Sequence, residues 1–148
     1  MLSAKKKVII SACILGEYCR YDGKTKELPN VAKAYEGWEI IPFCPEAPVF
    51  GTPRERINVV KVDNEYRIIT DESCVDVTQK LQNEIERFCA KYPHTDAIVL
   101  KAKSPSCGYG TTPILDQQKN IVEYKNGIGA TMLEKFYKGV KILDESRF

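Results

Sequence analysis

Short apolar runs alternate with helix-patterned and loop segments along this chain of 148 residues. Three runs have strand length and are rich in β-branched residues, at positions 6–12, 38–43 and 97–101, and a fourth lies at 140–143. Continuous apolar runs joined by crossover segments are typical of the buried strands of a parallel sheet. The pattern therefore predicts an α/β protein.

Two segments have the apolar period of amphipathic helices. The clearer one starts at Asp76 or Thr78 and ends before Pro93, and its apolar positions are Val77, Leu81, Ile85, Phe88, Cys89 and Tyr92. The second spans 128–138 and is followed by Gly139. A shorter helix is expected at 30–35, with Asn30 as its cap and Gly37 after it.

The remaining segments contain turn and loop signals. Residues 57–62 and 65–70 favour β structure on either side of Asp63-Asn64, which predicts a hairpin. We expect loops at 13–29, at the proline-rich 44–57 and at 109–127, the last with a short strand near 121–124. The prediction is one domain over residues 1–148, with a Rossmann-like three-layer α/β fold, a parallel sheet of about four strands and an inserted β-hairpin.

Composition and charge argue against nucleic-acid binding, secretion and membrane spanning, but they do not indicate a function. The net charge of +2 and the dispersed basic residues give no electrostatic case for nucleic acid. The lysines at 5–7 precede only three apolar residues before Ser11, whereas a secretion signal needs an apolar region of roughly 7–15 residues. No run has membrane-spanning length, so we expect a cytoplasmic protein that does not bind membranes.

Three of the six cysteines, Cys13, Cys44 and Cys107, lie at or just past the ends of predicted strands. Parallel strands end at the same edge of a sheet, and ligands bind at that edge. The pattern favours a metal or reactive-thiol site, with coincidence as the alternative. Thiolates without a nearby histidine are typical ligands of an iron–sulfur cluster or of zinc.

The other cysteines and the single histidine have simpler interpretations. Cys89 lies on the apolar face of its predicted helix, and Cys74 precedes that helix, so both favour packing roles or none. His94 is expected in a solvated turn at the opposite edge of the sheet. Cys19 could be a fourth ligand or a bystander. No secretion signal accompanies the cysteines, so a disulfide framework is the weaker interpretation.

A few polar residues lie next to the three cysteines in sequence. Glu46 follows Cys44 by two positions, which would put it beside any bound ligand, but from the residues alone a solvated carboxylate is the favoured interpretation. Ser104 and Ser106 flank Pro105 and could simply form a turn. Lys101 and Lys103 are candidates to stabilise thiolates.

These segments together resemble the family of thiouracil desulfurases. The resemblance rests on SACILG at 11–16, CRYDG at 19–23, CPE at 44–46 and SPSCG at 104–108, with weaker matches in DVT at 76–78 and GIGA at 127–130. The motifs occur in the family's order and cover essentially the whole chain. Together the cysteine motifs are specific, while each alone is weak.

The resemblance implies an iron–sulfur enzyme. By analogy a [4Fe–4S] cluster would be held by Cys13, Cys44 and Cys107, which leaves one iron open as a Lewis acid. Glu46 matches the family's acid/base residue and Ser104 its substrate-contacting serine. The implied reaction is the non-redox desulfuration of a thiolated nucleobase or related thioamide, such as 2-thiouracil to uracil and sulfide.

One departure leaves the substrate open. The family usually has a Gly-Gly stretch after its CPE motif, whereas this chain has APVFGTPR at 47–54. Two other classes also remain: an accessory protein that binds a cluster or sulfide without turnover, and a cluster-free thiol protein. Glu46 and Ser104 favour the enzyme, because a carrier needs no acid/base group beside its cluster.

Overall fold

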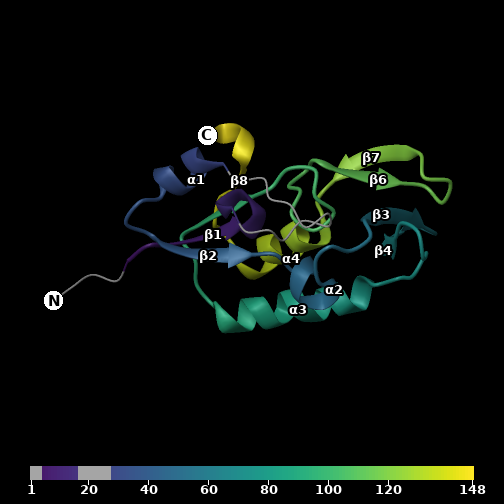
Figure 1. The fold of residues 1–148 in the computed structure, drawn as a ribbon, viewed down its shortest axis with the longest axis horizontal. Helices are drawn as coiled ribbons and strands as arrows, with labels where there is room; N and C mark the ends of the chain where they lie inside the picture. Colours follow the sequence, from purple (N-terminus) through teal and green to yellow (C-terminus); the bar gives the residue numbers. More distant parts are fainter. Residues whose placement is uncertain (1–4, 17–27) are drawn as a thin grey trace.

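Four parallel strands form the first sheet of the computed structural model, which describes residues 5–16 and 28–148. Their order is β2 (Glu39–Phe43), β1 (Lys7–Ser11), β5 (Ala97–Leu100) and β8 (Ile142–Asp144). Every neighbouring pair is parallel. We call this sheet A (Figure 1). It confirms the α/β prediction of about four parallel strands.

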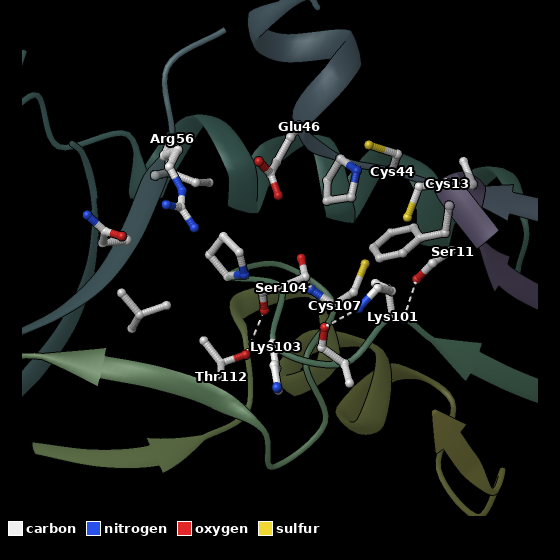
Figure 2. Close-up of a pocket in the computed structure, with 18 of the residues that line it drawn as sticks. Ser11, Cys13, Cys44, Glu46, Arg56, Lys101, Lys103, Ser104, Cys107 and Thr112 are labelled. Atoms are coloured by element: carbon white, nitrogen blue, oxygen red, sulfur yellow. Dashed lines mark hydrogen bonds between the residues drawn. The ribbon is translucent and has the colours of Figure 1, made fainter. Parts of the chain in front are cut away.

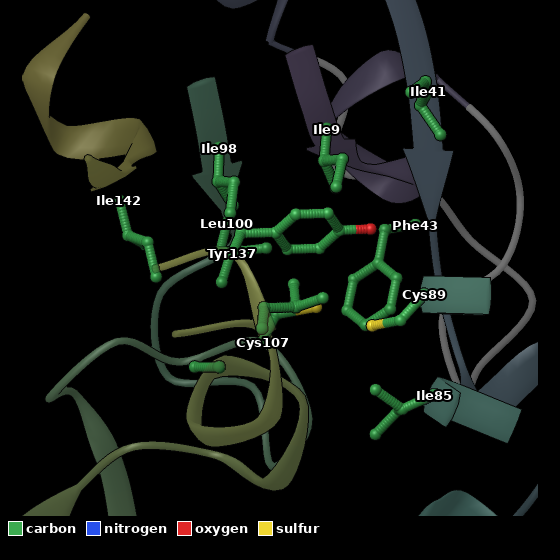
Figure 3. Close-up of a cluster of buried hydrophobic side chains, with 12 residues drawn as sticks. Ile9, Ile41, Phe43, Ile85, Cys89, Ile98, Leu100, Cys107, Tyr137 and Ile142 are labelled. Carbon is green, nitrogen blue, oxygen red and sulfur yellow. The ribbon is translucent and has the colours of Figure 1, made fainter. Parts of the chain in front are cut away.

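Helices cover both faces of sheet A, which makes three layers. On one face, Ile9 and Leu100 pack with Ile85 of α3 (Thr78–Lys91) and Leu133 of α4 (Ile128–Phe136), as Figure 3 shows for much of this cluster. On the other face, Ile10 and its neighbours pack against α1 (Pro29–Ala34) and the 3₁₀ helix η1 (Ala12–Leu15). Since both faces are buried, the strands need apolar residues at successive positions, which is the pattern in the sequence.

The predicted hairpin is present, but it belongs to a second sheet. Sheet B has the order β4 (Glu65–Thr70), β3 (Ile57–Val62), β6 (Thr112–Leu115) and β7 (Ile121–Lys125). The pairs β3–β4 and β6–β7 are antiparallel, whereas β3–β6 is parallel. The expectation of a loop through 112–115 was therefore wrong. Pro113 pairs with Tyr124 of β7, whereas only Ile114 and Leu115 pair with β3, so the missing N–H of proline costs no bond to β3.

Helix α3 supports both sheets. Its early residue Leu81 and the preceding Val77 pack under sheet B, whereas Ile85 and Cys89 pack under sheet A. In Figure 1 this helix runs along one side of the molecule beneath both sheets. The shared helix holds the two sheets in a fixed relation, with the carboxyl ends of β1, β2 and β5 facing sheet B.

Two local predictions need correction. The proline-rich segment after β2 contains a short helix, α2 (Glu46–Phe50), because Pro48 stands in its first turn, where a backbone N–H would have no partner in the helix. Asn30 lies inside α1 and is not its cap. The cap is Leu28, and Pro29 takes the first helical position, which suits its fixed φ. A final 3₁₀ helix, η2, covers Glu145–Arg147.

The described helices include none that is both long and apolar enough to cross a membrane. Cys89 is buried in the core, Cys74 is exposed, and His94 is exposed before β5, at the amino end of sheet A. These three placements agree with the sequence-based expectations. Cys19 lies outside the described residues.

Candidate functional site

A pocket of about 320 Å³ lies between the carboxyl edge of sheet A and sheet B. Sheet A contributes the segments that follow β1, β2 and β5, and sheet B contributes residues of β3 and β6. Figure 2 shows the side chains that line it. The pocket therefore forms at the place where parallel sheets usually bind their ligands.

Three cysteines line one end of this pocket: Cys13, Cys44 and Cys107. Cys13 lies in η1 immediately beyond β1, and Cys44 directly follows β2. Cys107 comes seven positions after the end of β5, on a loop that turns back to the sheet. Because β2, β1 and β5 are adjacent, the three chain segments arrive side by side, and their sulfur atoms lie at the same end of the pocket (Figure 2).

The loop that carries Cys107 is held by Ser104. The Ser104 hydroxyl oxygen accepts hydrogen bonds from the backbone N–H groups of Ser106 and Cys107, both at 3.1 Å. The Thr112 hydroxyl donates to the Ser104 carbonyl at 2.6 Å, which ties the loop to β6. Ser104 thus forms the turn expected from sequence, and it also lines the pocket.

The glycine-rich start of helix α4 packs against the same loop and is hydrogen-bonded to it. The backbone N–H of Ile128 donates to the Pro105 carbonyl, and that of Ala130 donates to the Ser106 carbonyl. A Cβ at Gly127 would lie 2.6 Å from the Pro105 oxygen, and one at Gly129 would lie 2.5 Å from the Ser106 oxygen. Glycine is therefore required at both positions of the GIGA segment, because the loop backbone lies too close for a side chain.

Replacing Gly129 with alanine should destabilise the protein and displace the loop. The new methyl group would meet a backbone carbonyl that cannot move without breaking the Ala130 hydrogen bond, so we expect a loss of about 1–3 kcal/mol in urea unfolding. Gly139→Asn is the control, because its side chain would meet open space at a positive φ that asparagine tolerates. A Gly129→Ala protein as stable as the control would contradict this packing.

Glu46 is buried beside the cysteines and is held through both carboxylate oxygens. Its Oε1 lies 3.3 Å from Nη2 of Arg54, and its Oε2 accepts a 2.9 Å hydrogen bond from the Ser106 hydroxyl. The residue is only 9% exposed. The interpretation of Glu46 as a solvated carboxylate is therefore wrong, because it sits in the pocket wall with a fixed orientation.

Arg54 reaches Glu46 from a loop that is itself anchored. Its Nη1 donates to the Gly51 carbonyl at 2.9 Å. The next residue, Glu55, accepts hydrogen bonds from the backbone of Ser73 and Glu72, and these keep the pKa of Glu55 below its usual value. The sequence analysis did not identify Arg54 as a functional residue. The one indication was that Arg54 belongs to the TPR segment, which this chain retains from the family pattern after the CPE motif.

Burial and neighbouring acidic groups disfavour the thiolate form of Cys107. Burial raises the pKa of Cys107 well above its usual value, and the neighbouring Cys44, Cys13 and Glu46 raise it further, against a hydrogen bond from Ser11. Lys101, a candidate to stabilise thiolates, lines the same pocket and pairs through its Nζ with Glu145 at 2.8 Å. Thiols in such surroundings are deprotonated when a metal binds them.

Within the described residues, no group of three His, Cys, Asp or Glu side chains is arranged to hold one metal ion. In a [4Fe–4S] cluster each cysteine binds a different iron, so its ligands stand farther apart than those of one ion. Soft thiols without a histidine suit either an iron–sulfur cluster or zinc.

The DVT segment at 76–78 has a structural role distant from the pocket. Asp76 accepts hydrogen bonds from the side chain of Arg67 and from both the backbone N–H and the hydroxyl of Thr78. Partial burial raises the pKa of Asp76, but these hydrogen bonds outweigh it and lower that pKa to about 2. Thr78 also accepts from the backbone of Ile68, so the segment fastens the start of α3 to β4.

Comparison with known proteins identifies the family of this chain. The sequence profile of the 2-thiouracil desulfurase family matches residues 8–146. The chain belongs to this family. The resemblance inferred from the cysteine motifs is confirmed.

Two known proteins are similar to this chain. The solved structure of the [4Fe-4S]-dependent thiouracil desulfidase TudS aligns with a TM-score of 0.73 at 30% identity, over 97% of this chain and 93% of that one. YbbK of Bacillus subtilis (strain 168), an uncharacterised protein, is 31% identical over 111 residues, which is 70% of this chain and 74% of YbbK. The family and the structural neighbour are desulfurating enzymes, which supports the enzyme class at this level.

Proposed function

We propose that this protein is a [4Fe–4S]-dependent desulfurase that converts a thiolated pyrimidine or related thioamide to the corresponding carbonyl compound and sulfide. The observation that carries the proposal is the gathering of Cys13, Cys44, Cys107, Glu46 and Ser104 around one pocket. Three cysteine ligands would leave one iron of the cluster without a protein ligand. When bound, the cluster supplies a Lewis-acidic iron for the thiocarbonyl sulfur.

The protein side chains have separate tasks in this reaction. Water provides the oxygen of the new carbonyl group, and its protons leave with the sulfur as hydrogen sulfide, so no oxidant or reductant is needed. Glu46 removes a proton from the attacking water as a general base. Ser104, whose oxygen already accepts two backbone hydrogen bonds, has its own hydrogen to donate to the substrate ring.

The altered loop after the CPE motif borders this substrate space. Glu46 begins α2, and Arg54 and Arg56 at the end of the loop line the same pocket. In this chain the helix α2 follows the cysteine, at the place in the sequence where the family usually has Gly-Gly. We propose a small thiolated ring as the substrate class, with its substituents set by this loop.

Anaerobic reconstitution followed by an assay with 2-thiouracil tests the proposal. Broad visible absorption from the cluster together with sulfide and uracil in equal amounts is the expected result. A stable cluster without sulfide release from any thiolated pyrimidine would replace the enzyme with an accessory iron–sulfur protein. Failure to take up iron and sulfide under these conditions would leave a cluster-free thiol protein and end the proposal.

A further inference from the structure

The buried guanidinium of Arg54 has one donor whose acceptor the described residues do not provide. The side chain is 6% exposed and lines the pocket. Its Nη1 donates to Gly51 and its Nη2 faces Glu46. Among residues 5–16 and 28–148, no group accepts a hydrogen bond from its Nε, and Arg54 Nε is the one buried side-chain nitrogen or oxygen in that part of the chain without a partner.

A buried donor without an acceptor is costly, by roughly 1–3 kcal/mol and more for a charged group. Proteins keep such groups where a ligand or an ordered water completes them. Arg54 lines the pocket beside Glu46, and its Nε is covered in this structure, so a small shift of the side chain would let a molecule in the pocket supply the missing acceptor. A pyrimidine ring carries suitable acceptors in its carbonyl oxygen or ring nitrogen.

From this arrangement we infer that Arg54 has two roles: it positions the general base Glu46 and it contacts the substrate. Through Nη2 it positions the Glu46 carboxylate, together with Ser106 on the other oxygen, and through Nε–H it donates to an acceptor atom of the thiolated ring. This inference rests on the proposed function, because it gives roles in that reaction to residues that the sequence motifs did not assign. Arg54 is thus a specificity and positioning residue, and Ser106 is a positioning residue only.

Three variants separate these roles. Ser106→Ala removes one support of Glu46 and no substrate contact, so kcat should fall by up to about 100-fold with KM unchanged. Arg54→Gln removes the charge and Nε together, so kcat should fall and KM should rise about 10-fold or more. Arg54→Lys retains a cation for Glu46 but has a methylene where Nε stood, so most of kcat should return while KM stays raised.

The control is Arg67→Gln. Arg67 also forms an arginine–carboxylate pair, with Asp76 at 2.8 Å, but on the surface of sheet B and away from the pocket. Both kinetic constants should stay at wild-type values. Thermal unfolding and the visible spectrum of the cluster are recorded for every variant, so that a loss of fold or cluster is separated from a loss of positioning.

Direct binding provides a readout that does not depend on turnover. In protein carrying Glu46→Gln, the dissociation constant of 2-thiouracil should rise about 10-fold when Arg54→Lys is added and should not change when Ser106→Ala is added. If Arg54→Gln does not fold, Arg54→Lys and Ser106→Ala still give the split between kcat and KM.

The outcomes distinguish this inference from the proposed function. A wild-type protein that binds the cluster but releases no sulfide contradicts the proposed function itself. An active wild type whose Arg54→Lys variant has unchanged KM and unchanged binding overturns the substrate contact. An active Ser106→Ala variant with full kcat overturns the positioning of Glu46.

Discussion

Replacing Cys107 with serine should leave a folded protein that cannot hold a stable cluster or release sulfide. Cys107 is 6% exposed and lies with Cys13 and Cys44 at one end of the pocket, so no other described thiol can take its place. A serine hydroxyl is a much poorer ligand for iron than a thiolate. Altering a residue that merely supports a metal ligand already costs roughly 10–100-fold, so losing a ligand should cost more.

The comparison set contains all the described cysteines. Cys13→Ser and Cys44→Ser should behave like Cys107→Ser, measured by bound iron and sulfide, visible absorption and sulfide release after anaerobic reconstitution. Cys74→Ser is the matched control, because Cys74 is exposed and far from the pocket. Cys89→Ser should lower stability through its core position but keep the cluster. A cluster retained by Cys107→Ser and lost by Cys89→Ser would refute the ligand assignment.

The parts of the fold that follow from local pattern were predictable. The strand runs, the two main helices and the hairpin at 57–70 rest on periodicity and turn residues, and the structure has all of them. Predicting that Cys13, Cys44 and Cys107 lie close together required one further argument. Parallel strands end at the same edge of a sheet, so residues that follow them meet there. Besides the 3₁₀ helices η1 and η2, the missed elements are α2 and β6, and each contains a proline, which sequence rules count against regular structure. Pro48 stands in the first turn of α2, and Pro113 pairs with Tyr124 of β7 but lies outside the β3 ladder.

Contacts between distant segments could not be predicted in this way. The Ser106–Glu46 hydrogen bond joins residues 60 positions apart, and Lys101 finds Glu145 near the other end of the chain. Such pairings depend on how the two sheets are placed on α3, which no local pattern records. For this reason the sequence analysis proposed Lys101 as a partner of the thiols and could not foresee its ion pair with Glu145, at the start of the loop that carries Cys107.

Replacing Glu46 with glutamine should abolish turnover without loss of the cluster. The carboxylate is the pocket's proposed base, and general acid–base catalysis typically contributes about 10²–10⁴-fold, so kcat should fall by that amount. The variant should fold normally. A glutamine can turn its amide oxygen to Arg54 and its NH₂ to Ser106, whose hydroxyl oxygen can accept as well as donate.

Glu39→Gln is the matched control for this loss. Glu39 begins the same strand β2 whose other end precedes Glu46, and its side chain forms an exposed pair with Lys7. Its removal should leave kcat and the cluster spectrum unchanged. Because Glu46→Gln retains the side-chain shape and the three cysteines, a normal spectrum with absent sulfide release assigns the defect to proton transfer. Full activity in Glu46→Gln would instead mean that water attacks the thiocarbonyl carbon without this carboxylate, and Arg54 and Ser106 would then have no base to position.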